Sequence, residues 1–183
     1  AAALLAYHVA DRLPWSKDQA ALIARARYLN GDFTPDPEAL AAALYGKISL
    51  AEITANDLEP LLPHALRAEI ERELPSHFTA PTGNRLPIDY AAENGPALEI
   101  RVQELFGLDR HPSVGHGRIP LLLLLLSPAH RPIQTTRDLP GFWRGSWKDV
   151  VKDMRGRYPR HPWPDDPRPG GTESGKGRHG GGE

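Results

Sequence analysis

An uninterrupted run of six leucines at residues 121–126 limits the folds open to this chain more than any other feature. Ile119 stands just before the run, and Ser127-Pro128 ends it. A membrane helix needs about 20 apolar residues, so this run is too short to cross a bilayer. Leucine does not favour strands by propensity, but an apolar run of this length between turns is typical of a central strand. We therefore predict a strand over residues 119–126 that is buried on both faces of its sheet.

Length and composition are those of an ordinary soluble protein. The chain has 183 residues, of which 40% are hydrophobic and 25% are charged, so we expect one domain, or a small domain with a helical lead-in. It has no cysteine, which excludes disulfides and thiolate metal sites and fits a reducing compartment. The N-terminal residues lack the pattern of a signal peptide. We therefore expect a cytoplasmic protein that does not bind membranes.

Short helices are predicted throughout residues 1–75. The alanine- and leucine-rich residues 1–12 favour a first helix. Ser16 and Gln19 form a capping box for a second helix, which Asn30-Gly31 ends. Further helices are predicted at residues 35–44 and at residues 63–74. Residues 49–52 form one more capping pattern, and Thr54 or Asn56 can cap a helix that runs to residue 61. We interpret residues 1–75 as a helical lead-in segment.

Short strands take over from residue 76 onward. Their predicted positions are residues 77–80, 85–90, 98–102 and 133–136, in addition to the leucine run. The intervening residues 81–84 and 92–96 are turn sequences, and residues 103–107 favour one helical turn that ends at a glycine. We therefore predict an α+β fold, in which an all-helical N-terminal half precedes a small mixed β-sheet domain at residues 76–168.

A C-terminal helix is predicted to pack with this sheet. Asp138 starts a helical turn, and Ser146 with Asp149 forms a capping box for the main helix. Gly156 is expected to end that helix. Proline recurs too often in residues 158–164 for a helix, so we expect an extended segment that its aromatic side chains hold in place.

The last residues, 169–183, are rich in glycine, serine and charge and are predicted to be a disordered tail. They contain a near match to a phosphate-binding loop, in which four residues separate Gly170 from Gly175-Lys176. Gly177 stands where that loop needs serine or threonine to reach Mg²⁺, and no strand or helix is predicted around it. We therefore predict no cofactor site here.

Histidines and acidic pairs do not form a convincing metal or catalytic site. His111 and His116 lie five residues apart in a glycine-containing loop, without an HExxH motif or a nearby cysteine. His130 and His161 each lie beside arginine and proline, and no G-x-S-x-G motif occurs. Asp165-Asp166 is interpreted as a solvated pair. We predict neither a bound metal nor a catalytic residue in these residues.

Charge is distributed unevenly along a chain whose net charge is −1. Residues 1–75 contain 11 acidic and 7 basic side chains, whereas residues 127–168 contain 9 basic and 5 acidic ones. Such a separation indicates an anionic partner for the basic part. The alternative is that the acidic and basic parts dock on each other.

The best candidate for a functional surface lies in residues 127–167, which hold three of the four tryptophans. It contains eight candidate cations for binding nucleic acid: Arg131, Arg137, Arg144, Lys148, Lys152, Arg155, Arg157 and Arg160. Such cations contact phosphates, and unpaired bases stack on aromatic rings. The candidate rings are Trp143, Trp147, Tyr158 and Trp163. The alternative is that the tryptophans form a core and the cations a solvated face.

Two functional hypotheses follow from this stretch. A nucleic-acid surface predicts that Arg144, Lys148, Lys152 and Arg155 form one continuous exposed patch, since they recur at spacings of three and four. A protein–protein docking module without nucleic-acid contact predicts that the same side chains pair internally or lie scattered.

Several pieces of the sequence, in one order, resemble the C-terminal region of bacterial HrpB-type ATP-dependent helicases, a branch of the DEAH-box RNA helicases. The matching pieces are residues 81–85, 88–90, 102–108, 126–132, 138–143 and 155–164. The lead-in resembles the preceding helical segment more weakly and is shortened around residues 44–46. The resemblance covers roughly residues 4–167.

This resemblance implies a parent enzyme that hydrolyses ATP with Mg²⁺ in two RecA-like domains and remodels RNA. The phosphate loop, DEAH box and arginine finger of that machinery do not occur in these residues, so no catalytic residue is carried over. The resemblance implies an accessory domain whose partners are RNA and the helicase core, and which extends the RNA path or braces the core. We expect the structural anchors of the domain to be Gly83, Asp89, Gln103, Glu104, Trp143, Trp147 and Tyr158.

Overall fold

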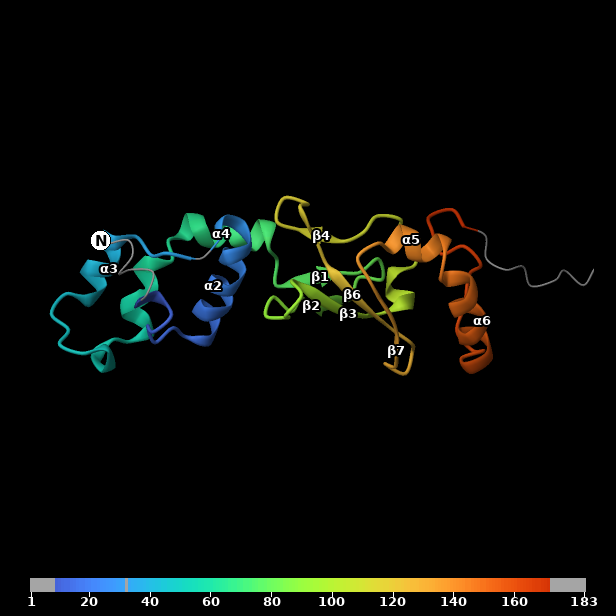
Figure 1. Ribbon diagram of the computed structural model, residues 1–183, viewed down its shortest axis with the longest axis horizontal. Coiled ribbons are helices and arrows are strands. Elements are labelled where there is room, and N and C mark those ends of the chain that lie inside the picture. Colours follow the sequence, from blue (N-terminus) through green and yellow to red (C-terminus); the bar gives the residue numbers. More distant parts are fainter. Residues whose placement is uncertain (1–8, 32, 172–183) are drawn as a thin grey trace, which may run out of the picture. The chain divides into compact units, whose positions relative to one another are not determined.

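The computed structural model of the protein describes residues 9–31 and 33–171 (Figure 1). The chain divides into two compact units, Ala1–Ser76 and His77–Glu183. The first unit consists of helices, and the second combines short strands with helices. This arrangement confirms the predicted α+β class.

The first unit is built from short helices. Within its described residues these are α2 (Lys17–Asn30), α3 (Pro37–Leu44), η1 (Leu50–Glu52), η2 (Ala55–Leu61) and α4 (His64–Glu73), where η marks a 3₁₀-helix. Ser16 and Gln19 form the predicted capping box, because Ser16 Oγ accepts a hydrogen bond from Gln19 N at 3.2 Å and Gln19 Oε1 accepts one from Ser16 N at 3.0 Å. Gly31, with φ of 80°, ends α2 as predicted.

One local prediction for this unit is wrong. Ser49 makes no side-chain cap to η1. The Glu52 carboxylate instead accepts a hydrogen bond from the backbone N–H of Ile48 at 3.1 Å, so one bond to the residue before Ser49 replaces the expected box. The helix predicted over residues 1–12 lies mostly outside the described residues, and residues 9 and 10 are helical.

The core of the first unit is mainly aliphatic. One cluster of its buried side chains consists of Leu13, Leu40, Ile53, Leu58 and Leu61. Two polar side chains are also buried, and each is hydrogen-bonded, as burial requires. Gln19 Nε2 donates to the carbonyl of Ala55 at 2.9 Å. Arg25 donates to the carbonyl of Leu74 at 3.0 Å and to the Glu71 carboxylate at 2.7 Å.

The second unit contains a three-stranded mixed sheet in the order β3–β6–β7. β3 (Ala97–Arg101) is parallel to the central strand β6 (Leu122–Leu126), and β7 (Pro132–Thr136) is antiparallel to β6. Two antiparallel pairs accompany this sheet. β1 (His77–Thr79) with β2 (Arg85–Pro87) precedes it in sequence, and β4 (Ser113–Val114) with β5 (Ile119–Pro120) lies between β3 and β6. Its helices are η3 (Val102–Leu105), α5 (Leu139–Arg144) and α6 (Trp147–Arg157).

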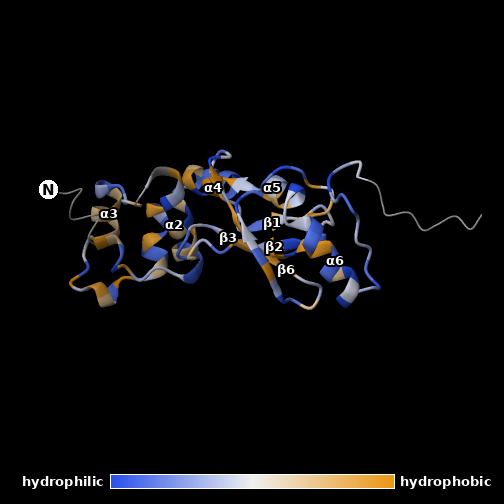
Figure 2. Ribbon diagram, turned by 45° about the vertical axis from the view of Figure 1, so that its right-hand side comes forward, coloured by the Kyte–Doolittle hydropathy of each residue, from blue (hydrophilic) through white to orange (hydrophobic). Residues whose placement is uncertain are grey.

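The leucine run is the central strand, as predicted, but it is not buried on both faces. The predicted strand is interrupted at Leu121, which lies between β5 and β6 and belongs to neither. Leu123 and Leu125 are 0% and 1% exposed, whereas Leu122 and Leu124 are half-exposed. Successive side chains of a strand point to opposite faces, so one face of β6 is fully buried and the other only partly. β6 is nevertheless apolar along its whole length (Figure 2).

The start and end of α6 also differ from prediction. Asp138 caps α5, since its carboxylate accepts a hydrogen bond from Gly141 N at 2.9 Å. Only two residues then separate α5 from α6, and Ser146 already has helical φ and ψ of −60° and −25° without a side-chain cap. A capping side chain requires extended backbone, so the predicted Ser146–Asp149 box does not form. The helix continues past Gly156 and ends at Arg157.

Candidate nucleic-acid interface

The three tryptophans of the candidate stretch form an aromatic core. Trp143, Trp147 and Trp163 are only 5%, 1% and 6% exposed. They surround Phe106, whose ring centroid lies 6.2, 5.6 and 6.2 Å from theirs. Rings this buried cannot stack on nucleic-acid bases. The hypothesis that these tryptophans stack on bases is therefore wrong, and the alternative that they form a core is confirmed.

Each of these indole N–H groups donates to a backbone carbonyl, either at Leu108 or in the proline-rich segment that follows α6. Trp143 Nε1 donates to Leu108 at 2.8 Å, and Trp163 Nε1 donates to Tyr158 at 2.9 Å. Trp147 Nε1 donates to Pro164 at 3.1 Å. Buried indoles usually find such partners. These bonds hold the proline-rich segment after α6 and fix the rotation of α6 about its axis.

The fixed rotation leaves one side of α6 free to carry cations. Trp147, Val151 and Met154 are buried, whereas Lys148 and Lys152 are exposed. Residues four apart on a helix have Cβ atoms about 6 Å apart, so the two ammonium groups can act together. Neither lysine side chain forms a hydrogen bond or ion pair with any residue in the described part of the chain.

Three of the eight predicted cations already have partners. Arg155 donates to the Trp163 carbonyl at 2.6 Å and to the Asp165 carboxylate at 2.7 Å. Arg157 pairs with the Asp153 carboxylate at 2.9 Å, one helical turn away. Arg137 donates to the carbonyl of Asn94. These arginines hold local structure, so they are less available to an external anion than the lysines.

The remaining three arginines, Arg131, Arg144 and Arg160, are exposed, but none of them lies on α6 with the two lysines. Arg144 lies on α5, and the chain leaves the helical conformation at Gly145, where ψ is −93°. Arg131 lies in the β6–β7 turn, where its backbone N–H donates to Ser127 Oγ at 3.1 Å. Ser127 Oγ also contacts the Tyr158 hydroxyl at 3.1 Å, which brings this turn to the C-terminal end of α6. Arg160 lies three residues after Arg157, the last residue of α6.

The structure thus groups part of the predicted set. Lys148 and Lys152 lie on α6, and Arg131 and Arg160 lie in the two segments that Ser127 and Tyr158 bring together at the end of that helix. The predicted continuous patch of Arg144, Lys148, Lys152 and Arg155 is interrupted at the break between α5 and α6 and at the Arg155 ion pair.

A buried carboxylate holds the β1–β2 turn. The Glu104 side chain is 6% exposed. It accepts hydrogen bonds from Thr82 Oγ1, from Asn84 Nδ2 at 3.0 Å and from Arg101 Nη2 at 2.7 Å. Burial raises the pKa of Glu104, but the hydrogen bonds from Thr82, Arg101 and Asn84 outweigh it and leave the pKa below its ordinary value. Glu104 is therefore a structural anchor, as the sequence predicts.

The other predicted anchors have simpler roles. Gly83 has φ of 90°, a conformation that favours glycine in the turn between β1 and β2. Asp89 pairs with Ala97 through two backbone hydrogen bonds of 2.8 and 2.9 Å. Its carboxylate also accepts a hydrogen bond from Ala91 N at 2.9 Å. The Gln103 amide oxygen is buried without a hydrogen-bond partner among the residues described.

His111 joins two elements through its two ring nitrogens. Its Nδ1 accepts a hydrogen bond from Leu139 N at 3.1 Å, so Nε2 carries the proton and donates to the Leu121 carbonyl at 2.7 Å. Burial lowers the pKa of His111. Across residues 9–31 and 33–171, histidines and acids form no group of three that could hold a metal ion.

The described residues do not fit the ATP and Mg²⁺ that a helicase needs. The near match to a phosphate loop begins at Gly170, and all of it beyond residue 171 lies outside the described residues, as does most of the predicted tail. No strand, glycine-rich loop and helix follow one another elsewhere in the described part of the chain as that loop requires. None of the described helices is long and apolar enough to span a membrane.

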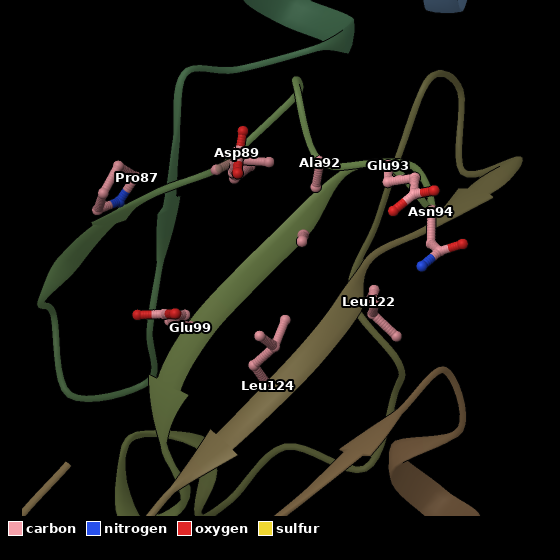
Figure 3. A pocket seen from close by; sticks show the side chains of 10 residues that line it. Pro87, Asp89, Ala92, Glu93, Asn94, Glu99, Leu122 and Leu124 are labelled. Atoms are coloured by element: carbon pink, nitrogen blue, oxygen red, sulfur yellow. The ribbon is translucent and has the colours of Figure 1, made fainter. Parts of the chain in front are cut away.

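One group of potential site residues was missed at the sequence level. Asp89, Glu93 and Glu99 line a cavity on the half-exposed face of β3 and β6 (Figure 3). The alternation in residues 98–102 could have placed Glu99 on a solvent-facing side, but nothing in the sequence showed that β6 would be half-exposed beside it.

Comparisons with known proteins agree with this fold and sequence. Residues 40–167 match the model of a family described as ATP-dependent helicase C-terminal. The chain is 52% identical over 110 residues to the ATP-dependent RNA helicase HrpB of Escherichia coli (strain K12), and the match covers 60% of this chain and 14% of that protein. This chain therefore corresponds to a small part of that relative.

Two solved structures are similar to the chain. The crystal structure of the E. coli DExH-box NTPase HrpB matches with a TM-score of 0.67 and 40% identity, over 90% of this chain and 23% of the other. The crystal structure of the Escherichia coli DEAH/RHA helicase HrpB matches with a TM-score of 0.57 and 37% identity, over 85% and 22%. The family match spans more than half of the 183 residues, and the chain belongs to the HrpB family of ATP-dependent helicase C-terminal regions.

Proposed function

We propose that this chain is an accessory domain of an ATP-dependent RNA helicase and that it guides single-stranded RNA along the exposed side of α6. Lys148 and Lys152 contact the phosphates of the strand. Arg131 and Arg160 continue the path at the end of the helix. ATP and Mg²⁺ are bound by the helicase core, a partner outside this chain, and the protein works in the cytoplasm.

One observation carries this proposal: Lys148 and Lys152 are exposed on successive turns of α6 and have no partner in residues 9–31 and 33–171. A flexible ammonium group without an internal partner is free to neutralise a phosphate, and the released counterions drive binding. The aromatic core beneath the helix keeps both lysines on the outside, so no rearrangement is needed before RNA binds.

The buried tryptophans restrict the mode of RNA binding. Base stacking adds affinity in many single-strand binders, but the three indoles of this stretch are not accessible for it. Binding therefore depends on phosphate contacts, and we expect it to be insensitive to base sequence and sensitive to salt.

The proposal is tested by fluorescence anisotropy with a labelled single-stranded oligouridine at low salt. The 183-residue chain is compared with its Lys148→Ala/Lys152→Ala variant. We expect the variant to bind about tenfold more weakly, because two phosphate contacts are lost at low ionic strength.

A matched control removes two exposed cations from the other unit. Arg12→Ala/Lys17→Ala changes the net charge by the same amount, and we expect its affinity to differ from wild type by less than about twofold. If both variants lose affinity equally, the chain binds RNA through overall charge, and the proposed strip on α6 is wrong. If neither loses affinity, RNA binds elsewhere.

A further inference from the structure

A groove lies on the half-exposed face of the β3–β6 sheet, in the second unit (Figure 3). Its volume is about 540 Å³, within the range of sites that hold a ligand. Leu122 and Leu124 of β6 form the apolar part of its floor together with Ala97 of β3. The parallel register places these side chains on one face, because Ala97 pairs with Leu122 and Glu99 pairs with Leu124.

Three carboxylates surround this apolar floor. Figure 3 shows Asp89, Glu93 and Glu99 spaced around the two leucines, with Asn94 beside Glu93. The groove is lined by no lysine, arginine or histidine. Glu93 and Glu99 form no ion pair with any residue that the structure describes, and Asp89 accepts a hydrogen bond only from a backbone N–H. The groove therefore combines an apolar floor with three carboxylates that form no ion pair in the described residues, although Arg137 donates to the Asn94 carbonyl at its edge.

A second hollow, of about 320 Å³, shares Glu99 with the first and continues along the same two strands. Leu126 of β6 and Arg101 of β3 lie in its wall and pair in the same parallel register. Arg85 and His130 line it as well, so the lining that holds carboxylates without cations is confined to the first hollow. The two hollows together form a track that follows the strands. A track of this kind suits an extended chain better than a compact small molecule.

We propose that this groove binds an extended protein segment in which lysine or arginine alternates with aliphatic residues. The aliphatic side chains cover Leu122 and Leu124, and the cationic ones pair with Glu93 and Glu99. Complementary charge selects the partner, since an acidic segment or an RNA phosphate would be repelled by the three carboxylates. The groove thus differs in chemistry from the basic side of α6, so one domain can hold RNA and a basic protein segment at separate sites.

The test uses the peptide N-acetyl-Leu-Lys-Leu-Lys-amide, added to the ¹⁵N-labelled 183-residue chain and followed by NMR. We expect concentration-dependent shifts at the backbone amides of Ala97, Leu122 and Leu124. The peptide N-acetyl-Ser-Lys-Ser-Lys-amide has the same charge without the aliphatic side chains, and we expect it to bind at least about tenfold more weakly. N-acetyl-Leu-Glu-Leu-Glu-amide should produce no shifts in the groove.

Two variants separate the groove from the RNA surface. Glu93→Gln/Glu99→Gln keeps the size of both side chains and should weaken the Leu-Lys peptide about three- to tenfold, as expected for two exposed charge pairs. Lys148→Ala/Lys152→Ala should leave peptide binding unchanged.

Several outcomes would overturn the proposal. These are an absence of shifts at Ala97, Leu122 and Leu124, equal binding of the Ser-Lys peptide, and displacement of the peptide by single-stranded RNA. Shifts at the groove amides on concentrating the chain alone, with a matching rise in sedimentation coefficient, would instead identify a second copy as the occupant. Loss of RNA binding in the α6 variant bears on the proposed function and leaves this test unaffected.

Discussion

The two sides of α6 differ in what they contribute to the protein. On one side, Trp147 is buried among other aromatic rings and its indole N–H is hydrogen-bonded. On the other, Lys148 and Lys152 reach solvent without a partner in the described residues. One helix thus separates a side that stabilises the fold from a side that is free to bind. Substitutions on the buried side should therefore reduce stability, whereas substitutions of the lysines should reduce binding and leave stability nearly unchanged.

The largest effect on stability is expected from Trp147→Ala. This change removes a fully buried ring from contact with Phe106, Phe142 and Trp143, whose centroids lie 5.6, 6.1 and 5.3 Å away. Large-to-small changes of this kind cost about 3–5 kcal/mol. Urea unfolding followed by circular dichroism would measure the loss. A loss near zero would mean that the aromatic core does not hold the second unit together.

Glu104→Gln should have a smaller effect. The neutral amide keeps the shape of the side chain but loses the charge-assisted bond from Arg101 and leaves a donor facing Thr82 or Asn84. Mismatched buried hydrogen bonds cost about 1–3 kcal/mol. The measurement is the free energy of unfolding in urea, with the exposed Glu99→Gln as the matched control. Equal losses in both variants would contradict the anchoring role of Glu104.

The pH dependence of stability should report on His111. Burial lowers the pKa of this histidine from 6.5 in the folded state, so the unfolded chain takes up a proton more readily. The resulting stability is fully present above pH 6.5 and is lost as pH falls through the lower folded pKa. Protonation of Nδ1 also breaks the hydrogen bond from Leu139 N.

The pKa of Glu104 is also lowered in the folded state, so its contribution to stability is likewise lost as the pH falls. This loss takes place below pH 4.5, the ordinary pKa of a glutamate side chain. Urea midpoints measured on both sides of pH 6.5 separate the two groups, because of these two only His111 titrates there. A His111→Gln variant should flatten this part of the pH profile. An unchanged profile in that variant would show that another group titrates in this range.

The smallest effect on stability is expected from Lys148→Ala/Lys152→Ala. Neither side chain has an internal partner among the described residues, and exposed substitutions usually change the free energy of unfolding by less than about 0.5 kcal/mol. Alanine also favours helices. A loss of several kcal/mol in thermal unfolding would mean that the lysines stabilise the fold, and the separation between the two sides of α6 would fail.

Local patterns in the sequence predict much of this fold, because they depend on neighbouring residues. The Ser16–Gln19 capping box and the turn at Gly83 are examples. The box predicted at Ser146 fails because α5 ends only two residues before α6, which leaves Ser146 helical. The half-exposed face of β6 could not be predicted, since it depends on what other segments do or do not cover.

The sequence predicts which cations belong to the candidate site, but not all of the ion pairs that they form. The Arg157–Asp153 pair follows from a spacing of four on one helix. Arg155 pairs with Asp165 only because the proline-rich segment returns to α6, where the Trp147 indole holds it. Sequence alone thus indicated a basic stretch, and the structure separates the cations that hold it together from those that are free.

The most direct test of this separation is the salt dependence of RNA binding by the wild-type chain and by Lys148→Ala/Lys152→Ala. For single strands, each phosphate contact contributes about 0.7 to the slope of log Kd against log salt concentration. We expect the variant to have a slope shallower by about 1.4 and an unchanged free energy of unfolding. An unchanged slope would show that the free lysines of α6 do not contact RNA, and it would contradict the division of α6 into a stabilising side and a binding side.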